Sequence, residues 1–217
     1  MSEGVRDEDL QLHRRAASGG KGTLNRIMRL FALEHSRCAY YADFALYGSA
    51  VLALAAVVTA LVPIDEWQTS LALVLAGLVS WSAIEYVLHR FVLHGIRPFQ
   101  TWHEVHHNRP TALICAPTIL SAALICILVF IPAWQLGDLW RACALTLGVV
   151  AGYFAYAATH HATHHWRGDH PWLLRRKRWH AMHHHDKVAV RCYGVSCEVW
   201  DYVFASQSDR SLSGRAN

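Results

Sequence analysis

The residues best suited to chemistry in this sequence are its histidines, which are numerous and clustered. The chain has 217 residues and 16 histidines, and thirteen of these lie in four short segments. The segments are residues 85–94 (EYVLHRFVLH), 103–107 (HEVHH), 160–165 (HHATHH) and 180–185 (HAMHHH). Imidazole is a ligand for Fe, Zn, Cu and Ni, so these groups indicate a metal site.

The spacing of the histidines predicts which of them point together. Residues i, i+3 and i+4 of a helix lie on one face. Sets with that spacing include His103, His106 and His107; His180, His183 and His184; and His160 and His164. The five-residue gap from His89 to His94 does not align in a straight helix, so we expect a helix end or a distortion there.

Ten such imidazoles are too many for one ion. A structural Zn²⁺ usually takes four ligands, and a catalytic one takes three and a water. The ten would serve two ions with about five ligands each, leaving room for water or O₂. The ligand type alone does not name the metal.

The composition indicates a membrane protein that would hold these groups at one surface. Apolar residues make up 53% of the chain and charged residues 17%, against about a quarter charged in soluble domains. Four apolar stretches, residues 44–62, 71–88, 113–133 and 139–158, have the length of membrane spans. The alternative is a soluble bundle of four buried helices, but soluble helices rarely stay apolar all round.

The basic residues predict the orientation of the spans. Residues 63–70 and 134–138 contain no Lys or Arg, whereas the N-terminal segment, residues 89–112 and the C-terminal segment hold nearly all of them. By the positive-inside rule these three segments face the cytosol. Arg141 is the exception, and it could snorkel to the outer boundary. Every histidine group then lies at or beyond a cytosolic helix end.

The rest of the chain divides into a membrane domain and two tails. Residues 1–20 read as a mobile basic tail with no signal peptide, residues 21–204 as the membrane domain and residues 205–217 as a polar tail. Leu24, Ile27, Met28 and Phe31 have helical spacing. They predict either an amphipathic helix on the inner leaflet or a helix packed against the cytosolic cap.

The histidine segments, together with GVSCEVWDYVF at residues 194–204, resemble the fatty acid hydroxylase/sterol desaturase superfamily and in particular its fatty acid 2-hydroxylase branch. The resemblance covers about residues 81–204. It implies an all-α integral membrane fold in which four transmembrane helices carry a cytosolic, histidine-rich helical cap. It also implies two iron ions, with zinc possible as a substitute, together with O₂ and electrons from a separate electron-transfer protein.

The resemblance implies ten metal ligands. They are His89, His94, His103, His106, His107, His160, His164, His180, His183 and His184. Either His161 or His165 could replace a neighbour, because the third motif is doubled. Iron is favoured over zinc because oxidation of a C–H bond needs a redox-active ion.

The chain departs from the branch at three places. A fused cytochrome b5 domain, frequent in eukaryotic fatty acid 2-hydroxylases, is not seen; NRPTALICAP follows HEVHH; and Ala205 and Ser206 stand where Gly-Thr is usual. These differences favour a bacterial inner-membrane enzyme with a separate electron donor. They leave the lipid substrate open.

Carboxylates near the histidines are candidates for orienting the ligands. Glu85 lies one turn before His89, and a charge within a span is costly unless it is paired. We therefore expect Glu85 to support the catalytic site by orienting a ligand. Further candidates are Glu104, Asp169, Asp186, Glu198 and Asp201.

Three functions fit these observations. The first is a membrane di-iron oxygenase that hydroxylates a long-chain lipid or fatty acyl chain. The second is another oxidation of the same superfamily, namely a lipid, sterol or carotenoid desaturase or a lipid-headgroup hydroxylase. The third is a non-redox membrane metal-binding protein, although transport would require ionisable ligands within the spans, and Glu85 is almost alone there.

Overall fold

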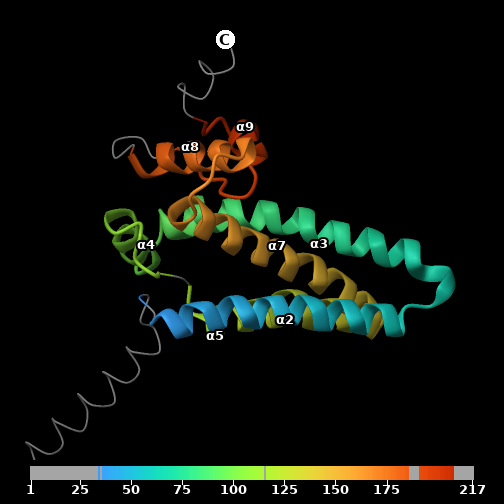
Figure 1. Cartoon of the computed structure of the whole chain (residues 1–217). Helices are drawn as coiled ribbons and strands as arrows, with labels where there is room; N and C mark the ends of the chain where they lie inside the picture. The colour runs from blue at the N-terminus through green and yellow to red at the C-terminus, as the bar shows by residue number, and fades with distance from the viewer. Residues whose placement is uncertain (1–33, 35, 115, 186–190, 208–217) are drawn as a thin grey trace, which may run out of the picture.

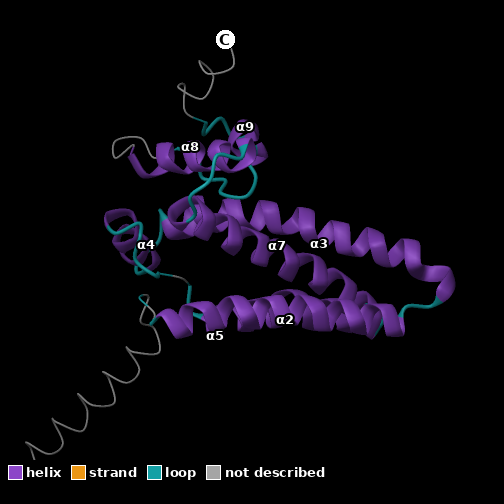
Figure 2. Cartoon of the chain, in the orientation of Figure 1, coloured by secondary structure: helices purple, strands orange, loops and turns teal. Residues whose placement is uncertain are grey.

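The structure is a computed structural model of the chain, and it describes residues 34, 36–114, 116–185 and 191–207. These residues are helical or irregular, apart from one isolated bridge between Glu34 and Ile114 (Figure 2). The predicted all-α class is confirmed. The expected mobile tail, the expected amphipathic helix at residues 24–31 and residues 208–217 lie outside the described residues.

Within the part of the chain that the structure describes, four helical runs are long and apolar enough to cross a membrane, which confirms the four expected spans. They are α2 (Arg37–Leu61); α3 (Trp67–Val87) with the π-helix η2 (Leu88–Leu93); α5 (Thr118–Ile125), the π-helix η3 (Cys126–Phe130) and α6 (Ile131–Leu136); and α7 (Leu139–His165). The third run exposes Ile119, Ile127 and Leu128 to at least 58%. An apolar surface of this kind suits lipid rather than water.

The ends of the spans differ from the expected boundaries. The third run begins at Thr118 rather than at residue 113, because Ile114 pairs with Glu34 and Pro117 has an extended ψ of 121°. The first begins at Arg37, where the Ser36 hydroxyl accepts a bond from the Ala39 N–H at 3.2 Å. The fourth continues to His165 instead of ending at residue 158, so its histidines are helical.

α3 and α7 pack closely against each other. This packing fixes the relative position of two helices whose C-terminal ends lead to the histidines. A Cβ atom on Gly148 would lie 2.0 Å from the Val74 carbonyl oxygen, and one on Gly77 would lie 2.3 Å from that of Leu145. Gly152 faces the Trp81 side chain in the same way. Small residues of this kind let membrane helices approach closely.

Three further helices lie toward one end of the bundle, where η2 and α7 finish (Figure 1). They are α4 (Phe99–Asn108), α8 (Pro171–His185) and α9 (Val199–Val203). At the other end, the short helix η1 (Ile64–Glu66) joins α2 to α3. Arg141 forms ion pairs there with Glu66 at 3.3 Å and Asp138 at 3.2 Å.

Candidate metal centre

The ten histidines expected as ligands converge on one region from η2, α4, α7 and α8. The first group consists of His89, His94, His103, His107 and His183. The second group consists of His106, His160, His164 and His180. Within each group the possible ligand atoms all lie within 4.8 Å of one another. Either group could therefore hold a metal ion.

His184 lies between the two groups. Its Nε2 atom is 3.1 Å from Nε2 of His180, and its ring stacks on His107 with a centroid separation of 4.3 Å. We count it with the second group because its Nε2 atom is within hydrogen-bond distance of Nε2 of His180. Each group then offers five imidazoles.

The expected distortion between His89 and His94 is confirmed. Residues 88–93 form a π-helix, and the His94 N–H donates to the His89 carbonyl at 3.2 Å. This i→i+5 bond widens the turn by one residue. Two histidines five positions apart therefore reach the same side of the helix, and their ring centroids are 5.3 Å apart.

The rings present their Nε2 atoms to one another. Seven contacts between these histidines join Nε2 to Nε2, at 2.8–3.2 Å. The Nδ1 atom of His89 donates to the Tyr193 carbonyl at 2.5 Å, and that of His183 to the Arg191 carbonyl at 3.0 Å. A carbonyl only accepts, so Nδ1 carries the proton and Nε2 presents a lone pair. Converging lone pairs fit a shared cation.

Burial keeps the cap histidines in the neutral state that binds metal. Desolvation lowers the pKa of His94 to about 4 and that of His106 to about 3. It also lowers the pKa of His103, His180 and His183 well below the usual value. Metal ligation requires neutral imidazole, so these side chains need lose no proton near pH 7.

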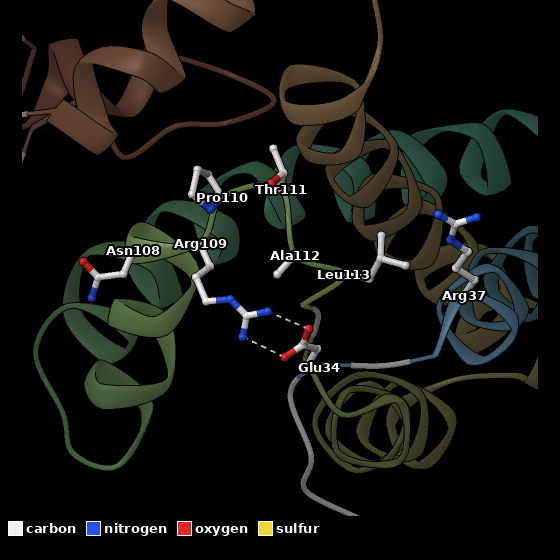
Figure 3. Close-up of a pocket in the computed structure, with 8 residues that line it drawn as sticks. All are labelled: Glu34, Arg37, Asn108, Arg109, Pro110, Thr111, Ala112 and Leu113. Carbon is white, nitrogen blue, oxygen red and sulfur yellow. Dashed lines mark hydrogen bonds and ion pairs between the residues drawn. The ribbon is translucent and has the colours of Figure 1, made fainter.

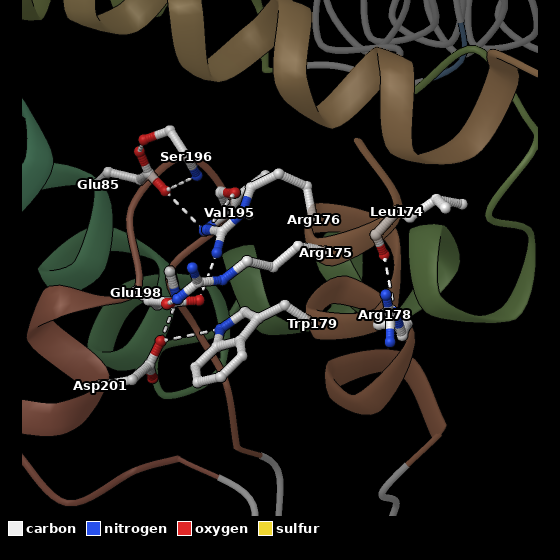
Figure 4. Close-up of polar contacts among 11 residues, drawn as sticks. Glu85, Leu174, Arg175, Arg176, Arg178, Trp179, Val195, Ser196, Glu198 and Asp201 are labelled. Atoms are coloured by element: carbon white, nitrogen blue, oxygen red, sulfur yellow. Dashed lines mark hydrogen bonds and ion pairs between the residues drawn. The ribbon is translucent and has the colours of Figure 1, made fainter. Parts of the chain in front are cut away.

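Glu85 contacts the backbone of a loop and no imidazole directly. The Glu85 carboxylate accepts bonds from the backbone N–H groups of Val195 at 2.7 Å and Ser196 at 2.9 Å, and from the Ser196 hydroxyl (Figure 4). The outward nitrogen of His89 is instead bonded to a backbone carbonyl. Glu85 therefore acts on the loop of residues 191–196 rather than on an imidazole.

Asp201 is the second carboxylate behind this loop and is fully buried. It accepts from the backbone N–H groups of Tyr193 and Gly194, both at 2.8 Å. The Ser206 hydroxyl donates to it at 2.7 Å and the Trp179 indole at 3.2 Å. Four donors satisfy the carboxylate, which makes its burial tolerable.

The other candidate carboxylates lie elsewhere. Glu198 pairs with Arg175 and with the buried Arg176 (Figure 4), which ties α8 to the segment before α9. Glu104 and Asp169 are exposed, and Asp186 lies outside the described residues.

His161 and His165 belong to neither group, so the structure does not support their replacing a neighbour. They stack on each other with ring centroids 4.6 Å apart. The Tyr40 hydroxyl lies 3.1 Å from Nδ1 of His161, so this pair faces α2.

A separate surface pocket of about 570 Å³ lies where α4 ends (Figure 3). Glu34 and Arg109 form two hydrogen bonds of 2.8 Å across it, and both side chains are more than half exposed. Arg37 and residues 108–113 complete the lining. The pocket contains none of the ten histidines.

Sequence reasoning missed the carbonyls of Arg191 and Tyr193. Backbone acceptors carry no residue-type signal, so neither position stood out. The available hint was the segment GVSC at residues 194–197, whose N–H groups need partners when the loop is buried.

Comparison with known proteins gives a consistent result. A family model described as fatty acid hydroxylase matches residues 74–206, more than half of the chain. A dihydroceramide fatty acyl 2-hydroxylase of Arabidopsis thaliana, FAH2, is 30% identical over 145 residues, 60% of this chain and 58% of that protein. Human fatty acid 2-hydroxylase is 28% identical over 152 residues, 61% of this chain and 38% of that protein. The match thus spans less than two thirds of these relatives.

One solved structure shares the fold. It is a structure of full-length Scs7p in which only the hydroxylase domain is visible. The TM-score is 0.68 and the sequence identity 23%, with 81% of this chain and 68% of that chain covered. At this identity the likeness speaks for the architecture alone.

Proposed function

The chain belongs to the fatty acid hydroxylase family, and from this premise we propose that it is a membrane di-iron oxygenase that hydroxylates a long-chain lipid or fatty acyl chain. O₂ and electrons from a separate protein would complete the reaction. The observation that carries the proposal is the convergence of Nε2 atoms in two adjacent groups. Zinc would bind the same ligands but has no redox chemistry.

The substrate class follows from the relatives and from the setting of the site. The relatives are named for fatty acyl, ceramide or fatty acid hydroxylation. The two groups lie where α3 and α7 end, and both helices have spanning length. An acyl chain in the adjoining leaflet could reach this level without leaving the apolar layer.

The chain's own residues would bind the ions, exclude water and set the local charge. The two iron ions would supply O₂ activation and removal of a hydrogen atom from a C–H bond. His106, His180 and His183 are buried, so α4 and α8 shield the site from solvent. All ten ligands are neutral. The buried carboxylates of Glu85 and Asp201 would offset part of the ions' charge from behind the loop.

We infer that the histidine-bearing end faces the cytosol. Arg37, Arg90 and Arg97 lie at this end, whereas the described residues of the opposite end include Asp65, Glu66 and Asp138 with Arg141. The positive-inside rule supports that orientation. Residues 21–204 would form the membrane domain. A bacterial inner membrane stays a prediction, since the relatives reported above are eukaryotic.

Lipid analysis of a bacterial expression host tests the proposal. Cells that express the wild-type protein should contain lipids heavier by one oxygen, as measured by mass spectrometry. His106→Ala should abolish this product, and His161→Ala, which alters a histidine outside both groups, should retain it. Both variants must reach the membrane in equal amounts.

The other outcomes distinguish the alternatives. Loss of two hydrogens that depends on His106 would make the protein a desaturase. An unchanged lipid profile in cells supplied with an electron donor, with metal still bound, would contradict an oxygenase and support a metal-binding protein.

A further inference from the structure

The two histidine groups differ in the hydrogen bonds of their Nδ1 atoms, which lie on the side of each ring away from the converging Nε2 atoms. In the first group, Nδ1 of His89 and of His183 donates to a backbone carbonyl. In the second group, Nδ1 of His106, His180 and His184 is buried and has no hydrogen-bond partner within the described residues. Only the first group is therefore held from behind by the loop.

The conformation of the loop of residues 191–196 places the carbonyls of Arg191 and Tyr193 beside the first group. Cys192 separates Arg191 from Tyr193, is completely buried and has a φ of 59°, in the left-handed region. Its N–H donates to the Ser206 carbonyl at 2.8 Å. A left-handed residue reverses the local course of the backbone. Both flanking carbonyls can therefore accept from rings of one group.

Two buried carboxylates hold the loop from the other side. The N–H groups of Tyr193 and Gly194 donate to Asp201, and the next two, of Val195 and Ser196, donate to Glu85. Four consecutive backbone donors are thus bonded to carboxylates from α3 and α9. Hydrogen bonds from four consecutive residues therefore fix the backbone of the loop against α3 and α9.

A fixed acceptor behind a ligating histidine has a known effect on metal binding. It sets the tautomer and the ring orientation and raises the basicity of the other nitrogen, and losing it typically costs 10–100-fold in affinity. A ring without such a partner is freer to rotate and to change tautomer. The rings of His89 and His183 are therefore oriented before an ion arrives, whereas His106, His180 and His184 have no such acceptor among the described residues.

We propose that the two ion sites are unequal: the loop of residues 191–196 makes the first group a tight, slowly exchanging site and leaves the second exchangeable. Glu85 and Asp201 are positioning residues that act through the loop. The inference rests on the proposed function only in that both groups hold ions.

Zinc release tests the inequality without relying on activity. The purified full-length protein in detergent is freed of metal, loaded with Zn²⁺ and exposed to a chelator, and the bound ions are counted over time. One ion should leave roughly 10–100-fold more slowly than the other. His180→Ala should keep the slow ion, and His183→Ala should lose it.

A matched pair at Glu85 tests the positioning role. Glu85→Leu removes every acceptor, and the slow ion should leave roughly 10–100-fold faster. In Glu85→Gln the amide oxygen can still accept from Val195 and Ser196, while its NH₂ donates to the Ser196 hydroxyl. This variant should restore slow release.

A buried carboxylate elsewhere provides the control for general destabilisation. Asp43 accepts from the Thr118 hydroxyl at 2.6 Å, between α2 and α5. Asp43→Leu should lower the thermal stability and leave zinc release unchanged. If Glu85→Leu does not fold, Asp201→Asn, which removes one of two acceptor oxygens, replaces it and should also speed release.

Two results would overturn the inference. One is the release of both ions at the same rate. The other is slow release in Glu85→Leu, or in its Asp201→Asn replacement, that equals the wild type. A protein that binds no ion would instead overturn the proposed function.

Discussion

The end of α7 carries two histidine pairs with the same spacing and different surroundings. His160 and His164 face α4 and α8, where their Nε2 atoms lie 3.0 Å from His106 and 2.8 Å from His180. His161 and His165, one position further along, stack beside Tyr40 of α2. An i, i+4 pair thus becomes a set of candidate ligands only when other chain segments supply nitrogen atoms opposite it.

The largest expected effect comes from substituting a histidine of the pair that faces α4 and α8, His160 and His164. His164→Ala removes one of the five imidazoles of the second group, so a chelator should remove the zinc ion held there faster than from the wild type. Lipid hydroxylation should fall below detection. His165→Ala should preserve both the rate of zinc release and the product. Equal losses in the two variants would contradict the distinction between the faces.

A second prediction concerns a substitution that should displace α7 relative to α3. Gly148→Ala places a Cβ atom 2.0 Å from the Val74 carbonyl oxygen, so the helices must separate. We expect a loss of about 1–3 kcal/mol of stability, measured as a lower melting temperature in detergent. Gly48→Ala is the control, because its nearest contact would be an ordinary 3.6 Å to Phe154.

A third prediction concerns acid and the buried rings of the cap. The pKa of His94 is lowered to about 4 and that of His106 to about 3, both by burial. The unfolded chain, with a histidine pKa of about 6.5, therefore binds more protons as the pH falls. The stability of the metal-free protein should be full above about pH 6.5 and decline between about pH 6.5 and 4.

Thermal unfolding of the metal-free protein at a series of pH values checks this sign. His106→Gln, which removes one such ring, should flatten the decline. A melting temperature that rises on acidification through the same range would refute the burial of neutral imidazoles.

The smallest expected effect comes from a change beside His161 and His165, the pair that faces α2. Tyr40→Phe removes the hydroxyl beside His161, and we expect a loss of about 0.5–1.5 kcal/mol. Metal content and the lipid product should not change. A fall in bound metal would mean that His161 and His165 influence the binding of the ions.

Much of the site was accessible from the sequence, because histidine spacing and apolar length are local properties. The distortion at residues 88–93 followed from the gap between His89 and His94. The division into groups was not accessible. The spacing placed His103, His106 and His107 on one face, but His103 and His107 lie in the first group and His106 in the second. Only the placement of the other helices decides such a division.

The remaining errors have similar physical causes. Hydropathy did not reveal that Ile114 pairs with Glu34 instead of joining the third span, because this pairing is a long-range contact. For Glu85 the sequence indicated a place near the ligands but not the groups that it contacts, which belong to the loop of residues 191–196. Its true partners are backbone N–H groups 110 and 111 positions away, which no local pattern indicates.

The measurement that tests the central claim most directly is X-ray absorption of the purified protein loaded with Zn²⁺, combined with a metal count. Two histidine groups predict about two ions per chain, with nitrogen neighbours at about 2.0–2.1 Å and no sulfur neighbour. One ion per chain or fewer, or sulfur neighbours at about 2.3 Å, would contradict the dinuclear histidine centre.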